Sequence, residues 1–84
     1  NYRNMLTQPQ WNLLKAAALE GELYEPTGMD FVMKYSLGNP STVLRSLEAL
    51  NRMELIYYDF NPDGKKYHVI NDLLFRRWIE GLNL

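Results

Sequence analysis

Apolar residues recur at helical spacing in the segment 39–55, and this is the clearest pattern in the chain. The members of the stripe are Val43, Leu44, Leu47 and Leu50, with Met53 close behind. The segment begins with Asn39 and Pro40. Asn39 can cap a helix, and Pro40 suits the first helical position because the N–H that proline lacks has no partner there. We therefore expect an amphipathic helix that begins at Pro40 and ends near Met53–Glu54.

The opposite face of this helix is small, polar and partly basic. Its residues are Ser41, Thr42, Arg45, Ser46, Glu48 and Arg52. Such a face suits a helix that reads DNA, because hydroxyl and cationic side chains can reach base edges and phosphates. It is equally typical of an ordinary amphipathic helix on a protein surface. The neighbouring elements are needed to distinguish these two interpretations.

A longer helix is predicted upstream, over residues 7–20, after a lead-in of residues 1–6. Thr7 and Gln10 have the spacing of a capping box, which favours a helix start at this point. The residues expected to face inward are Trp11, Leu13, Leu14, Ala17 and Ala18. Gly21 is the expected stop, because glycine accepts the conformation that commonly ends a helix.

A short helix and a tight turn precede the segment 39–55. Thr27 is expected to cap a helix over residues 28–35. The apolar residues of this helix are Phe31, Val32 and Tyr35. Gly38 is expected to supply a left-handed backbone conformation in the turn that follows. Before the short helix, residues 23–25 are a candidate for a brief edge strand.

A β-hairpin is predicted after the third helix. Aromatic and β-branched residues over 55–60, and the alternation over 65–70, indicate two strands. The sequence NPDG between them is a turn signal, because proline suits its second position and glycine its fourth. Alternation along the first strand places Ile56 and Tyr58 on one face and Tyr57 on the other.

Together these elements predict a mainly α fold with a small β-hairpin. This is the architecture of a winged helix-turn-helix, with a three-helix core, a wing and a C-terminal helix. We expect one domain over residues 1–84, in which 28–54 form the helix-turn-helix, 55–70 the wing and 71–82 the closing helix. The expected core comprises Trp11, Leu14, Ala18, Phe31, Val32, Leu37, Val43, Leu44, Leu47, Leu50, Leu55, Val69, Phe75 and Trp78.

Composition limits the classes of protein that this chain can represent. A chain of 84 residues with 46% hydrophobic content can bury one core. It has no cysteine, which excludes disulfides and thiol chemistry, and no apolar run approaches the roughly 18 residues of a membrane span. We expect a cytoplasmic domain with no membrane partner. The net charge of −1 argues against tight DNA binding, because DNA-binding domains are usually basic.

The sequence contains no recognisable catalytic motif. His68 is its one histidine and has no serine or aspartate partner at motif spacing. No cluster of metal ligands appears. The Gly64-Lys65 pair is not a P-loop, because Asp59 stands where that motif requires glycine. We therefore expect a domain that is not an enzyme and that holds no cofactor itself.

The chain resembles the winged-helix domain that follows the P-loop module in bacterial and archaeal AAA+ ATPases of the STAND type. The segments that carry the resemblance are LTQPQWNLLKAAALEG, EPTGMDFVMKYSLGNPSTVLRSLEAL and ELIYYD…DGKKYHVINDLLFRRWIE, in which Asp72, Phe75 and Trp78 match the pattern of the family. The resemblance spans Leu6 to Glu80. It implies a longer parent chain, with an ATP- and Mg-binding ATPase domain upstream of residue 1. It also implies regulatory contacts with that domain or with another protein.

Double-stranded DNA is the other partner to consider, because the second helix of a helix-turn-helix enters the major groove. The candidate DNA-binding residues are Lys34, Ser41, Thr42, Arg45, Ser46, Arg52, Lys65 and Lys66. Glu48, Asp59 and Asp63 lie on the same elements or in the wing turn and would repel phosphates. The sequence thus leaves two hypotheses. One is a regulatory protein-binding module, and the other is the sequence-specific DNA-binding domain of a transcription regulator.

Overall fold

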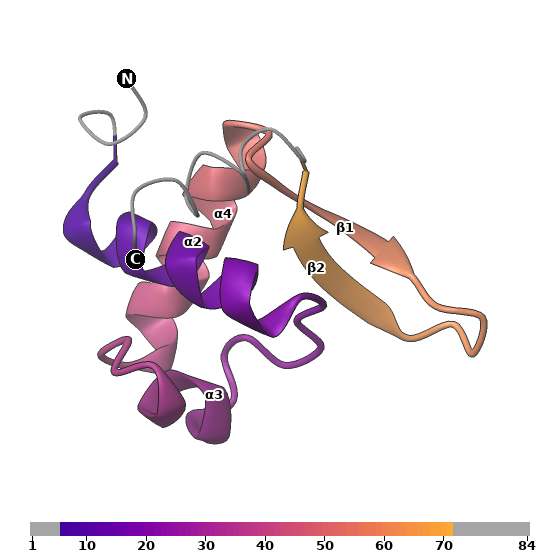
Figure 1. Ribbon diagram of the computed structural model, residues 1–84, viewed down its shortest axis with the longest axis horizontal. Helices are drawn as coiled ribbons and strands as arrows, with labels where there is room; N and C mark the ends of the chain where they lie inside the picture. The colour runs from indigo at the N-terminus through magenta and orange to yellow at the C-terminus, as the bar shows by residue number, and fades with distance from the viewer. Residues whose placement is uncertain (1–5, 72–84) are drawn as a thin grey trace.

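The computed structural model describes residues 6–71, and within this range the chain forms three helices followed by a two-stranded hairpin (Figure 1). The elements are α2 (Gln8–Glu20), α3 (Met29–Lys34), α4 (Pro40–Arg52), β1 (Ile56–Phe60) and β2 (Lys66–Ile70). The predicted order of long helix, short helix, long helix and hairpin is confirmed. The expected C-terminal helix beyond Asn71, with Phe75 and Trp78 of the expected core, lies outside the described residues.

Side-chain caps fix the starts of the two long helices. The Thr7 hydroxyl accepts a hydrogen bond from the Gln10 N–H, and the Gln10 side chain accepts one from the Thr7 N–H, so the predicted capping box is confirmed. Asn39 Oδ1 accepts a hydrogen bond from the Thr42 N–H at 2.9 Å. These contacts satisfy backbone donors that have no partner inside the helix.

The prediction that Thr27 caps α3 is wrong. Gly28 occupies the N-cap position, and no side chain caps this helix. The Gly28 N–H donates to the Glu25 carbonyl oxygen, so Thr27 lies within a turn that precedes the helix. The turn between α3 and α4 is as predicted: Gly38 has a φ of +91° and Leu37 is buried.

The core lies where α2 and α4 pack together, with α3 and the root of the hairpin closing its sides. The buried apolar residues are Trp11, Leu13, Leu14, Ala16, Ala17, Leu23, Val32, Leu37, Val43, Leu47, Leu50, Leu55, Ile56 and Ile70. Three residues of the expected core, Ala18, Phe31 and Val69, are only partly buried. The prediction that Leu44 is buried in the core is wrong, because its side chain is 47% exposed.

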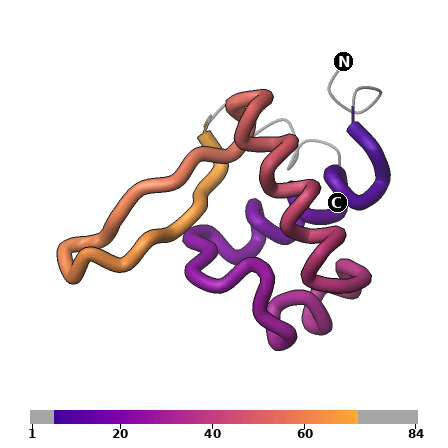
Figure 2. Tube along the Cα trace, turned by 180° about the vertical axis from the view of Figure 1, so that it is seen from behind, coloured from indigo at the N-terminus to yellow at the C-terminus, as the bar shows by residue number. Residues whose placement is uncertain are grey.

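The hairpin projects from the helices to one side of the molecule, as the views from front and back both show (Figures 1 and 2). Its strands pair antiparallel, with Tyr58 opposite His68. The predicted turn is closed by a hydrogen bond of 2.8 Å from the Gly64 N–H to the Asn61 carbonyl oxygen.

Within residues 6–71, a β-bridge between Leu23 and His68 helps to anchor the hairpin to the body. The Leu23 N–H donates to the His68 carbonyl oxygen at 2.8 Å, and the His68 N–H donates to the Leu23 carbonyl oxygen at 2.9 Å. This bridge is what the structure forms in place of the expected edge strand at residues 23–25. Beside this bridge, the core also contains Leu23, Ile56 and Ile70, none of which was predicted to be a core residue.

Replacing Leu47 by alanine should lower the free energy of unfolding by roughly 2–5 kcal/mol, because it deletes a buried side chain and leaves a cavity. Leu44 lies on the same helix and is half exposed, so Leu44→Ala is the matched control and should cost much less. Urea melts followed by circular dichroism measure both changes. Equal losses in the two variants would contradict the orientation of α4.

Candidate nucleic-acid and protein interface

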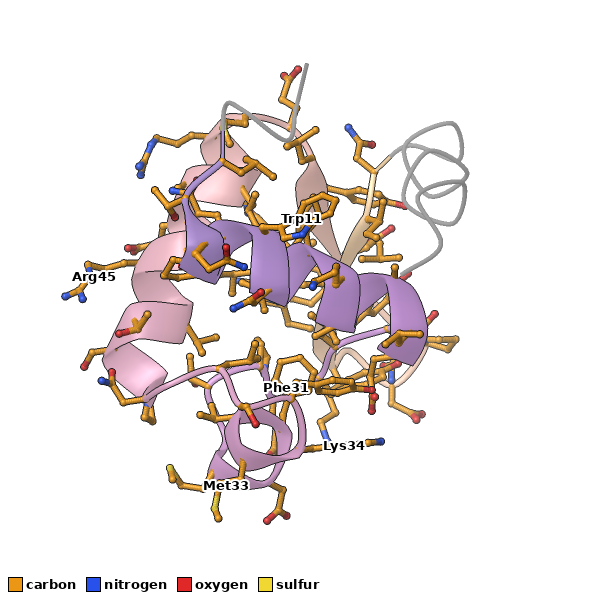
Figure 3. All side chains as sticks on the ribbon, turned by 60° about the vertical axis from the view of Figure 1, so that its left-hand side comes forward. Trp11, Phe31, Met33, Lys34 and Arg45 are labelled. Carbon is orange, nitrogen blue, oxygen red and sulfur yellow. The ribbon has the colours of Figure 1, made fainter. Side chains whose placement is uncertain are left out.

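The outer face of α4 carries charged, hydroxyl and apolar side chains together. Ser41, Arg45, Glu48 and Arg52 are exposed, and Leu44 lies among them. Figure 3 shows Arg45 pointing away from the body of the molecule. Thr42 is half-buried, and its N–H is bonded to the Asn39 cap. Five of the eight candidate DNA-binding residues lie on α4, and four of these five have some solvent exposure.

Ser46 is the exception, and its assignment to the outer face is wrong. Its exposure is 5%, so it lies inside, beside the buried stripe of Val43, Leu47 and Leu50. The inward-facing side of α4 differs from the predicted one. Ser46 faces inward, whereas Leu44, which was expected to face inward, is exposed.

Lys34, another candidate DNA-binding residue, forms an ion pair on the surface. Its Nζ lies 3.4 Å from Glu20 Oε2, and the Tyr35 hydroxyl donates a hydrogen bond to the same oxygen. The pKa of Glu20 is lowered, chiefly because of the Tyr35 hydrogen bond and then because of Lys34. The three side chains connect α2 to α3, and the carboxylate offsets the charge of Lys34.

The two wing lysines lie over tyrosine rings. Lys66 Nζ is 4.2 Å from the centroid of Tyr58, and Lys65 Nζ is 5.5 Å from that of Tyr24. Cations are attracted to the negative face of an aromatic ring, so these contacts help to position the ammonium groups. Both lysines are exposed.

The two faces of the hairpin differ in charge. The strand register places Tyr58, Phe60, Lys66 and His68 on one face, which we call the Tyr58 face. The rings of Tyr58 and Phe60 meet edge to face at 6.2 Å. The other face carries Asp59, whose carboxylate accepts a hydrogen bond from the Phe60 N–H at 2.8 Å. The paired residues of the Tyr58 face therefore include one lysine and no carboxylate, whereas the other face carries Asp59, Tyr57 and Tyr67, with Lys65 over the neighbouring Tyr24 ring.

A shallow pocket of about 330 Å³ lies between the end of α2 and α3. Its lining includes Glu20, Glu25, Met29, Asp30, Phe31 and Lys34. The side chains of Met29 and Met33 are exposed, Met33 to 71%. They are four residues apart and so lie on the same side of the helix. The pocket could not be predicted from the sequence, because its parts are separated along the chain and match no motif.

His68 lies at the anchor of the wing with one ring nitrogen unsatisfied. Within residues 6–71 its buried Nδ1 atom has no hydrogen-bond partner. Burial, and then the neighbouring Lys66 charge, lower the pKa of His68. The neutral imidazole is therefore the form that the folded wing accommodates.

Two classes of feature are absent from the described part of the chain. Residues 6–71 bring together no group of three His, Cys, Asp or Glu side chains suited to a metal ion. No helix in this range is long and apolar enough to span a bilayer.

Comparison with known proteins identifies the family. The chain matches the model of a family described as a probable winged helix domain, over residues 1–81. Because the match covers nearly the whole chain, the chain belongs to this family, and the predicted winged-helix fold is confirmed. No curated protein and no solved structure matches it.

The stability of the domain should fall as the pH drops below about 6.5, the ordinary pKa of histidine. In that range the unfolded chain binds a proton at His68, whereas the folded chain, with its lowered pKa, does not. Proton uptake by the unfolded state lowers the free energy of unfolding until the folded pKa is passed. Urea melts at pH 7, 6 and 5 measure the effect. His68→Gln should show a smaller pH dependence, and identical slopes in both proteins would contradict the assignment.

Proposed function

We propose that this winged-helix domain is the non-catalytic binding module of a AAA+, STAND-type P-loop ATPase. In this proposal it regulates the ATPase through protein contacts, either with the ATPase domain of its own chain or with a partner protein. The resemblance of the terminal segment, in which Asp72, Phe75 and Trp78 match the family pattern, supports the link to an ATPase. ATP and Mg would then be bound by the upstream domain.

The observation that carries the protein-binding role is the exposure of Leu44 at the centre of the outer face of α4. An apolar side chain flanked by Arg45 and Glu48 has the composition of a protein interface, with an apolar centre and a charged rim. A surface built for phosphates would be predominantly cationic and polar. Burial of Ser46 and the ion pair of Lys34 with Glu20 also favour a protein partner over phosphate.

Replacing Leu44 by aspartate in the full parent chain should weaken the contact of α4 at least about tenfold. The reason is that a carboxylate would enter the apolar centre of the interface, while an exposed position should not unfold the domain. The measurements are the ATP hydrolysis rate of the parent chain and the affinity of the 84-residue domain for the upstream fragment. Ser41→Ala, on the same face, is the matched control.

Two results would contradict this proposal. The first is an upstream sequence without a P-loop motif, which would remove the ATPase parent. The second is an unchanged affinity and hydrolysis rate in Leu44→Asp, which would remove α4 from the contact. The two results are independent, because the interface could serve a different parent protein.

Duplex DNA is the second candidate, and the exposed cations of α4 and the wing favour it. Arg45 and Arg52 lie on α4, and Lys65 and Lys66 lie in the hairpin. None of these four forms an ion pair with an acidic side chain within the described range. Binding would place the N-terminal part of α4, including Ser41 and Thr42, in the major groove, with the wing lysines on phosphates.

A salt titration of binding to duplex DNA tests this second candidate. Binding driven by phosphate contacts should weaken steeply with salt, and the triple variant Arg45→Ala, Lys65→Ala, Lys66→Ala should have a shallower slope, by about one unit per lost phosphate contact. Lys34→Ala is the matched control, because Lys34 is already paired with Glu20. Absence of binding at low salt would exclude DNA as the ligand of the isolated domain.

A further inference from the structure

The Tyr58 face presents apolar rings to solvent beside a cation. Tyr58 is half exposed and Phe60 is 56% exposed, on a hairpin that extends away from the helices. Lys66 is held over the Tyr58 ring, so its ammonium group stays next to the exposed apolar surface. Exposed aromatic side chains that gather with a cation are typical of interaction surfaces. The chemistry predicts a partner surface that is apolar and acidic.

The region around α3 has this complementary chemistry. Met29 and Met33 offer exposed thioether side chains, and the adjacent pocket is lined by Glu20, Glu25 and Asp30. The lining has three carboxylates against the single ammonium of Lys34, which gives a formal charge of −2. We call this region, formed by the two methionines and the three carboxylates, the α3 surface. Figure 3 shows Met33 pointing outward from α3.

We propose that the Tyr58 face of one copy of this chain binds the α3 surface of a second copy. Lys66 would approach the carboxylates of the pocket, where opposite charges attract. The rings of Tyr58 and Phe60 would contact the exposed methionines, a favourable combination of sulfur and aromatic groups. This inference does not depend on which protein α4 binds, whereas DNA held by the wing lysines would compete with it.

Charge favours contact between a Tyr58 face and an α3 surface over contact between two identical surfaces. Pairing two Tyr58 faces would bring Lys66 against its own copy, and pairing two α3 surfaces would bring acidic pockets together. Both place like charges opposite each other, which costs free energy. The cross contact avoids this cost.

Because the two surfaces use different residues, one copy can engage two neighbours at once. The contact is heterologous, so association should continue beyond a dimer into a ring or an open chain. With one lysine and two aromatic rings on one side, the contact should be weak and become significant at high local concentration.

Sedimentation velocity of the 84-residue chain, from about 10 µM to about 1 mM, tests the proposal. The mean mass should rise with concentration past that of a dimer. A wing variant, Phe60→Ser with Lys66→Gln, and an α3 variant, Met33→Ser with Asp30→Lys, should each associate at least about tenfold more weakly. The control is Tyr57→Ser with Lys65→Gln, which likewise removes an aromatic ring and a lysine charge, but outside the Tyr58 face, and should associate as the unchanged chain does.

Mixing the wing variant with the α3 variant gives the sharpest result. Each retains the surface that the other lacks, so the mixture should form a dimer and stop there. Circular dichroism checks the fold of each variant. Tyr58→Ser replaces Phe60→Ser, and Glu25→Lys replaces Asp30→Lys, if either original substitution unfolds the domain.

Three outcomes would overturn the proposal. They are a monomeric chain at every concentration, a mixture that stays monomeric, and control variants that lose association equally. A chain that stays monomeric, but binds duplex DNA or a separate acidic peptide in a Lys66-dependent manner, would assign the Tyr58 face to that partner instead.

Discussion

The packing of α2 against α4 is the constraint on which the rest of the molecule depends. It buries one side of α4, with Val43, Leu47 and Leu50 in the common core, and so determines which side chains can reach a partner. Rotation about the axis of α4 is not free, because exposing this stripe would cost roughly 1.5–3 kcal/mol for each large side chain. Leu44 and Arg45 are therefore exposed because Val43, Leu47 and Leu50 fill the core. The residues that stabilise the domain thus determine which side chains of α4 can reach a partner.

Much of the fold could be predicted because its signals are local. The caps at Thr7 and Asn39 and the turn at Gly64 depend on residues within four positions of each other, and all three were predicted correctly. The rotation of α4 could not be predicted, because Leu44 and Ser46 both fit a helical pattern and only the packing of α2 decides between them. The bridge from Leu23 to His68 could not be predicted from local sequence patterns either, because those residues are far apart in the sequence.

The candidate site shows the same division between local and long-range information. The sequence identified the exposed cations of α4 and the wing, because charged side chains at these positions have few alternatives to solvent. It could not reveal that Glu20 pairs with Lys34 across two helices, or that Lys66 lies on the face of the hairpin opposite to that of Asp59. Both facts bear on partner choice, and both follow from the tertiary arrangement. A count of basic residues therefore overstates the attraction of this domain for phosphate.

The carboxylate of Asp59 has a consequence for the solubility of the wing. Antiparallel pairing directs the backbone groups of Ile56, Tyr58 and Phe60 away from β2, towards the free edge of β1. Ile56 is buried, and Asp59 occupies the Phe60 N–H, so the open edge is reduced to a short stretch around Tyr58. Within residues 6–71, so short an open edge is a poor template for another strand, which disfavours pairing from edge to edge. The wing thus displays aromatic rings while little of the described edge of β1 is open to pairing.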